Sequence, residues 1–270
     1  MSEKYIRNPA IGAIWSSIYS SDTHRLKREP FMAHLSVYAG LLMQFAHPLV
    51  SDAGVNYSYG LDKFFHRSFR TLIIINDLFG KSSEADRTSA ASFINQIHHA
   101  HAKRGVKGAI DRETLEWVWA TVAYCNLKTQ LIFVGPLTEI ETENYIQYSA
   151  HCGSLIGVQT DIDSWEKLDF YIQNKISKLN LNKNSLFLAE QLHKQHRGIF
   201  AIGPLADFGF QIAASIMPQR LVQKYNLPWL HPLDSNLMWA TQHLWKRIIP
   251  IVTTGLVGTT SSPSFQKVKK

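Results

Sequence analysis

Apolar side chains recur every three or four residues along most of this chain, which is the spacing of one face of an α-helix. The stretch from Pro30 to His47 follows this period, and strand-like alternation is scarce elsewhere. We therefore predict an all-α protein. The helices that the pattern predicts, with ends at proline, glycine or capping residues, cover about residues 30–47, 61–78, 83–103, 111–133, 138–155, 163 onwards, 184–193, 204–217, 219–225 and 236–249.

Polar residues mark the breaks between these helices. The region around Asp52 is polar and contains glycine, which predicts a loop over about residues 48–60. The segment Thr138–Glu141 is a capping box that opens a helix, and we expect Asp163–Glu166 to open the next helix in the same manner.

The chain shows no internal repeat and no shift in composition that would mark a second domain. Its 270 residues suffice for a substantial core. We predict a single helical domain over residues 28–250, preceded by an N-terminal extension over residues 1–27. The last residues are rich in serine, threonine and lysine, so we expect residues 251–270 to form a flexible basic tail.

Composition narrows the class of protein. Hydrophobic residues make up 45% of the chain and charged residues only 18%, against an average of about 25% charged, which fits a helical protein with much buried surface. The net charge is +7, but the sequence contains no basic helix, zinc finger or RNA-binding signature, so we expect no nucleic-acid partner.

The sequence also bears on membrane contact and location. No stretch reaches the roughly 20 apolar residues that span a bilayer, and peripheral membrane contact stays open. Two cysteines without a spaced framework and no secretory signal predict a cytoplasmic protein without disulfides.

Two polar clusters lie within apolar helical segments and are the strongest candidates for chemistry. Arg67, Arg70 and Thr71 are spaced to share one helical face, and His98 and His101 share a face in the same way. Cationic and imidazole groups among phenylalanines and isoleucines are costly to bury without a partner. A cofactor or an anionic ligand would supply that partner.

Several familiar chemistries find little support in the sequence. The pair His98-x-x-His101 supplies only two zinc ligands, and no carboxylate stands one turn away to complete a site. No nucleophile elbow, phosphate loop or dinucleotide-binding motif occurs. Other histidines, including His193 and His196, lie among lysines and arginines and fit an ordinary core or surface role.

A haem group would suit the two clusters together. A neutral imidazole on an apolar face can ligate iron, and cations on a facing helix can meet the propionates or bound oxygen. The simpler alternative is that Arg67 and Arg70 form ion pairs with Asp62 and Asp77.

A series of motifs in the same order resembles a known family, the latex-clearing protein (rubber oxygenase) catalytic domain, which also includes fungal oxygenases of the MpaB type bound to the endoplasmic reticulum. The resemblance covers roughly residues 28–250. The matching segments are Gly40–Val50, Ala53–Val55, Arg67-x-x-Arg70-Thr71, Ile97–Ala100, Leu115–Thr121 and Phe133–Glu141.

The resemblance implies an all-α protein with a globin-like core around b-type haem. It maps the axial iron ligand onto His98, with His99 as a competitor if the motif is shifted by one residue. The distal Arg-x-x-Lys-Thr motif of the rubber-cleaving members maps onto Arg67, Arg70 and Thr71, so that arginine replaces the lysine.

Other positions also depart from the family. Trp119 stands where many relatives have histidine, and no glutamate near His47 matches the base proposed for the rubber enzymes. Asp52 is a poor substitute for that base, so cleavage of polyisoprene is not carried over.

We therefore expect a haem b-dependent oxygenase that acts with O2 on an apolar, lipid-like small molecule. His98 would bind the iron, Arg70 and Thr71 would contact oxygen, and Arg67 would offset the propionate charge. His47 would support the cofactor and Asp52 would assist catalysis near the pocket entrance. The alternative is a non-catalytic helical binding or scaffold protein with a degenerate haem site, and the sequence does not indicate the oligomeric state. Aromatic residues would line a hydrophobic channel in the oxygenase, namely Phe45, Phe64, Phe69, Trp117 and Trp119.

Overall fold

The computed structural model describes residues 22–23, 26–27, 30–57, 74–75, 77–79, 84–199 and 203–244. The chain divides into a unit of residues 1–233 and a unit of residues 234–270, and each is described by itself. The elements are β1 (Asp22–Thr23), β2 (Leu26–Lys27), α2 (Pro30–Phe45), α3 (Pro48–Tyr57), α5 (Glu84–Lys103), α6 (Arg112–Thr129), the π-helical turn η3 (Gln130–Val134), α7 (Glu139–Ser154), α8 (Trp165–Lys178), α9 (Lys183–Ile199), α10 (Gly203–Ile216) and α11 (Gln219–Tyr225).

Helices dominate the described residues, as the period of the apolar positions predicts. The two short strands pair antiparallel, with Asp22 opposite Lys27 and Thr23 opposite Leu26. The second unit contains a helix over residues 235–244. The prediction of an all-α protein is confirmed, whereas the predicted domain bounds stay a prediction.

The loop that we predicted over residues 48–60 is wrong, because α3 occupies residues 48–57. Pro48 takes the first helical position, where its missing N–H costs nothing. The carbonyl of His47 accepts hydrogen bonds from the backbone N–H groups of Val50 and Ser51, both at 3.0 Å. The polar residues around Asp52 therefore do not mark a loop. They lie on α3, where Asp52 bonds to other parts of the chain.

Capping residues set the starts of α6, α7 and α8. The side chain of Asp111 accepts from the backbone of Thr114 at the start of α6. The predicted capping box at the start of α7 is confirmed, with Thr138 and Glu141 bonded reciprocally. At α8 the cap lies one residue later than predicted, because Ser164 is the N-cap.

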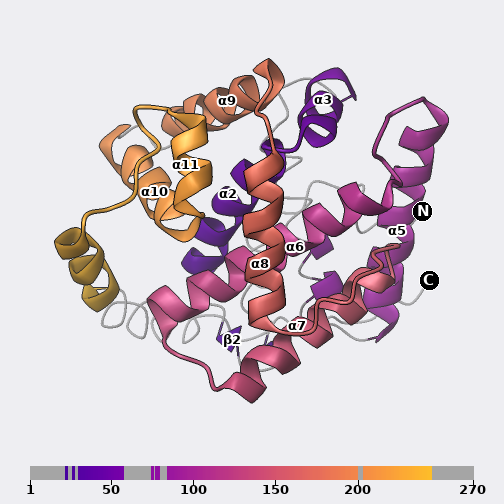
Figure 1. Ribbon diagram of the computed structural model, residues 1–270, viewed down its shortest axis with the longest axis horizontal. Coiled ribbons are helices and arrows are strands. Elements are labelled where there is room, and N and C mark those ends of the chain that lie inside the picture. Colours follow the sequence, from indigo (N-terminus) through magenta and orange to yellow (C-terminus); the bar gives the residue numbers. More distant parts are fainter. Residues whose placement is uncertain are drawn as a thin grey trace, which may run out of the picture. The chain divides into compact units, whose positions relative to one another are not determined.

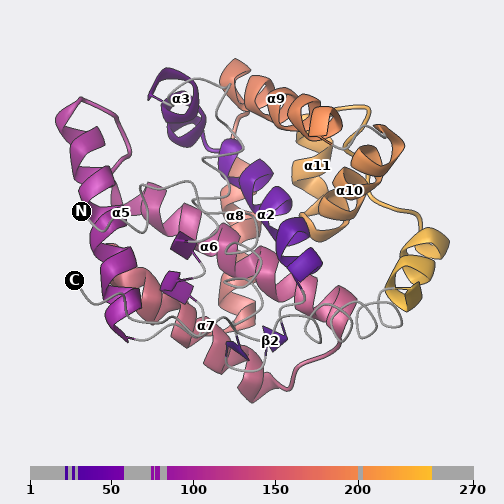
Figure 2. The ribbon, with the colours of Figure 1, turned by 180° about the vertical axis from the view of Figure 1, so that it is seen from behind.

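The core of the first unit is built around α2 and α6, which pack against each other (Figures 1 and 2). Helix α10 covers α2 on one side, and α9 packs on α10, α3 and α2. Helices α7 and α8 pack on α6 and on each other. In both views α5 lies on the side of α6 that is remote from α9 and α10. The histidines of α5 and those of α9 therefore occupy different regions of this unit.

Two further predictions concern covalent chemistry and the membrane. Cys125 and Cys152 are both free and buried. None of the helices in the described part of the chain has both the length and the apolar character needed to cross a membrane.

Candidate functional site

Helix α5 presents the predicted axial histidine. Two side-chain contacts attach this helix to α7: Arg87 Nη2 donates to Tyr148 Oη at 2.9 Å, and Asn95 Nδ2 donates to the carbonyl of Leu155 at 2.9 Å. His98 follows Asn95 by three residues, so it continues the same side of α5 just beyond the end of α7. Its ring is half-buried.

The electrostatics of His98 favour a neutral imidazole. Burial lowers its pKa from the ordinary 6.5, and the neighbouring imidazoles of His101 and His99 lower it further. The structure shows no hydrogen bond from the His98 ring to any residue that it describes. A neutral imidazole with an unused lone pair is the form that binds iron.

His99 is the competing candidate, and its environment differs. Its ring is exposed, and Nδ1 lies 2.7 Å from the carbonyl oxygen of Asn95, one helical turn earlier. Such a contact makes Nδ1 the protonated nitrogen, which leaves Nε2 free to bind a ligand. His99 therefore has a suitable tautomer but lacks the burial of His98.

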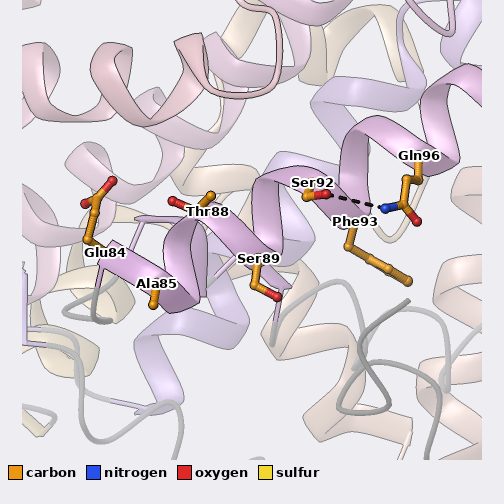
Figure 3. A pocket seen from close by; sticks show the side chains of 7 residues that line it. All are labelled: Glu84, Ala85, Thr88, Ser89, Ser92, Phe93 and Gln96. Carbon is orange, nitrogen blue, oxygen red and sulfur yellow. Dashed lines mark hydrogen bonds between the residues drawn. The ribbon is translucent and has the colours of Figure 1, made fainter.

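An open cavity of about 610 Å³ lies along α5 (Figure 3). Its described lining comes from one face of this helix and is mostly polar, and Gln96 donates to Ser92 across one turn at 3.4 Å. The described lining residues are Glu84, Ala85, Thr88, Ser89, Ser92, Phe93 and Gln96. His98 is not among them, whereas His99 follows Gln96 on the same side of the helix.

The aromatic residues that we expected in a hydrophobic channel lie in the core where they are described. Phe45, Trp117 and Trp119 are all buried. Trp119, which stands where many relatives have histidine, donates its indole N–H to the carbonyl and the Oγ of Ser149 at 3.0 and 3.1 Å. A Cβ at Gly153 would lie 2.9 Å from Trp119 Cδ1, so this glycine makes room for the indole. Trp119 thus joins α6 to α7 through these hydrogen bonds and this packing contact.

His47 lies in the short turn between α2 and α3, apart from the α5 histidines. It is buried, and its ring centroid is 6.4 Å from that of Trp117. Trp117 and Trp119 point to nearly opposite sides of α6, because two residues correspond to about 200° of helical rotation. His47 therefore meets α6 on the Trp117 side, whereas α7 meets it on the Trp119 side. No contact among the described residues brings His47 to His98.

Asp52 occupies a hydrogen-bonded junction between α3 and the start of α9. Its Oδ1 accepts from Asn182 Nδ2 at 2.9 Å and from Asn184 Nδ2 at 2.8 Å. Ser51 and Ser185 join the same network through the side chain of Asn182. The carboxylate thus holds two helices together, and a catalytic role for it stays a prediction.

Arg67, Arg70 and Thr71 lie outside the described residues, as do Asp62, Phe64 and Phe69. Among the described residues, no three His, Cys, Asp or Glu side chains gather to hold a metal ion.

Sequence reasoning did not identify the partners of the other buried histidines. His193 Nε2 lies 2.6 Å from Asp207 Oδ1, and His196 Nδ1 lies 2.8 Å from Tyr38 Oη. The expectation that these histidines play an ordinary structural role agrees with these contacts. Tyr38 lies on α2, far away in the sequence, so no local motif could have indicated it.

Comparison with known proteins gives the family. No curated protein and no solved structure matches the chain. Residues 24–244, which are most of the chain, match the family described as "ER-bound oxygenase mpaB/B'/Rubber oxygenase, catalytic domain". The family predicted from the sequence motifs is confirmed, and this protein belongs to the mpaB and rubber oxygenase catalytic-domain family, a family of oxidoreductase enzymes.

Proposed function

We propose that this protein is a haem b-dependent oxygenase that acts on an apolar, lipid-like small molecule, with a globin-like arrangement of helices around the cofactor. The observation that carries the proposal is the state of His98 within an oxygenase catalytic domain. Its ring is half-buried, its pKa is lowered by burial, and it has no hydrogen-bond partner among the described residues.

These properties fit an axial haem ligand. A ligand imidazole has to be neutral and has to offer a free lone pair, and His98 meets both conditions. We favour it over His99 because His98 is half-buried, whereas His99 is exposed. The chemistry that haem supplies when bound is the activation of oxygen at iron.

The remaining roles follow from the family resemblance and the chemistry of each side chain. Arg67 would offset the charge of the haem propionates, and Arg70 and Thr71 would donate hydrogen bonds on the oxygen side. Arg70 stays protonated at every ordinary pH, so it acts as a fixed donor and not as an alternative iron ligand. Roles for His47 near the cofactor and for Asp52 in catalysis stay predictions.

The test is a spectroscopic comparison of haem binding by wild type, His98→Ala, His99→Ala and a control, His151→Ala. His151 is an exposed histidine on α7. We expect a Soret band in wild type, His99→Ala and His151→Ala, with a carbon monoxide shift after reduction. In His98→Ala we expect loss of haem and recovery when free imidazole is added, because imidazole can occupy the space left by the side chain.

Each variant has an outcome that decides between assignments. Full haem retention in His98→Ala together with loss in His99→Ala would transfer the axial role to His99. A wild-type protein that takes up no haem, although circular dichroism shows it folded, would favour the non-catalytic binding protein. Imidazole rescue separates loss of a ligand from loss of the fold.

A further inference from the structure

The turn between α2 and α3 contains polar groups that the proposed oxygenase function leaves unexplained. The Nδ1 atom of His47 and the Nε1 atom of Trp117 are both buried, and neither has a hydrogen-bond partner in the described part of the protein. The side chains are 7% and 0% exposed, and their ring centroids are 6.4 Å apart. Leaving a buried donor or acceptor unpaired destabilises the folded protein, so two such groups on neighbouring rings call for a shared explanation.

The chemistry of the two atoms is complementary. The indole nitrogen can only donate a hydrogen bond, whereas a neutral imidazole has one donor and one acceptor nitrogen. Burial is the largest influence on His47 and lowers its pKa, which favours the neutral form. With the proton on Nε2, the buried Nδ1 accepts. A single hydroxyl group could then accept from Trp117 and donate to His47.

The outer edge of this region carries an ion pair. Lys175 Nζ on α8 lies 2.5 Å from Glu113 Oε1 on α6. Both groups, together with Asp111, influence the pKa of His47, the carboxylates raising it and the lysine lowering it. The pair joins α6 to α8 beside the imidazole, and the lysine side chain is only 21% exposed.

We propose that His47 and Trp117 form a second binding site that takes one hydroxyl group, from a water molecule or from a small alcohol. The site lies on the Trp117 side of α6. Buried waters typically make two to four hydrogen bonds to otherwise unpaired groups, and these two atoms supply the minimum. This assignment gives His47 a role separate from the α5 histidines.

The chain provides an internal control for the experiment. Trp119 lies two residues further along α6 and is equally buried, but its indole N–H is already paired with Ser149. We would record water cross-peaks at the indole N–H signals of the full-length, isotope-labelled protein by nuclear magnetic resonance. We expect a cross-peak between water and the Trp117 N–H, and none at the Trp119 N–H.

Two further measurements identify the bound molecule and its hydrogen-bond acceptor. If an alcohol replaces water, titration with methanol or ethanol should shift the Trp117 signal saturably and leave the Trp119 signal unchanged. A water cross-peak without such a shift means that water alone occupies the site.

Variants at His47 test the acceptor. His47→Leu removes it, and the Trp117 cross-peak should be lost, whereas His47→Asn keeps a polar atom near the Nδ1 position and should retain it.

The proposal is overturned if Trp117 shows neither a water cross-peak nor an alcohol-dependent shift in the wild-type protein. Both tests use the wild type, so they hold even if a His47 variant fails to fold.

Discussion

Helices α5 and α9 each carry two histidines three residues apart, and their surroundings differ. On α9, His193 and His196 are buried, and each ring is hydrogen-bonded to a side chain of another helix. On α5, His98 is half-buried and has no such partner among the described residues. Equal spacing on a helix thus gives a hydrogen-bonded pair in the core on α9 and an available imidazole on α5.

The partners make the difference, and they come from elsewhere in the chain. Asp207 on α10 pairs with His193, which also stacks on Trp229 with ring centroids 4.1 Å apart. Tyr38 on α2 pairs with His196. A histidine whose ring is hydrogen-bonded in the core stabilises the fold, whereas His98, which has no such bond to a described residue, is available to bind a ligand.

The largest effect that separates the two regions should come from His193→Ala. This change removes a buried ring stacked on Trp229 and leaves Asp207 without its closest partner. We expect the free energy of unfolding to fall by about 2–4 kcal/mol, measured by urea denaturation followed by circular dichroism. His98→Ala, measured without added haem, should cost less than about 1 kcal/mol. Equal losses in the two variants would mean that both histidines are structural.

A smaller effect is expected from removing one hydroxyl beside the α9 pair. Tyr38→Phe keeps the ring but takes away the hydrogen bond to Nδ1 of His196. Because His196 is buried and Tyr38 is half-buried, we expect a loss of about 1–3 kcal/mol in the free energy of unfolding. The matched control is Tyr148→Phe on α7, whose hydroxyl accepts from Arg87. Arg87 keeps its second partner, Glu84, so this variant should lose under about 1 kcal/mol. A larger loss of stability in Tyr148→Phe than in Tyr38→Phe would contradict the difference that we draw between the two regions.

Local patterns predicted most helices of the fold. Apolar period and capping residues gave the bounds of α2, α5, α7 and α11 to within a few residues, because these signals act within one turn of the chain. The prediction was wrong where polar residues have long-range contacts and do not mark a loop. Asp52 looked like a loop residue but lies in a helix, where its carboxylate binds the amides of Asn182 and Asn184.

The candidate site was predictable only in part. Motif order identified the family and the α5 histidines, because these features are contiguous in sequence. The separation of His47 from His98 by α6 was not predictable, since it depends on which sides of α6 meet the α2–α3 turn and α7. The replacement of histidine by Trp119 likewise becomes intelligible only through its contacts with Ser149 and Gly153.

The smallest effect concerns pH and tests the neutral state of His98. Burial, with the adjacent His101 and His99, lowers the pKa of this imidazole in the folded protein below its ordinary value of about 6.5. As the pH falls, the unfolded chain therefore takes up a proton more readily than the folded chain, and the free energy of unfolding decreases. His98 contributes fully above pH 6.5, and its contribution declines as the pH drops below that value. His47 has a lowered pKa as well, so it adds a decline of the same sign.

The measurement is urea unfolding of wild type and His98→Gln at several values between pH 7.5 and pH 5. We expect the wild type to lose stability on acidification and the variant to lose less, so that the two curves converge or cross at the acidic end. His47→Gln should reduce the slope in the same sense, because glutamine takes up no proton. If His98→Gln and wild type showed parallel curves, His98 would not be held neutral by the fold, and the contrast with the bonded histidines of α9 would lose its electrostatic basis.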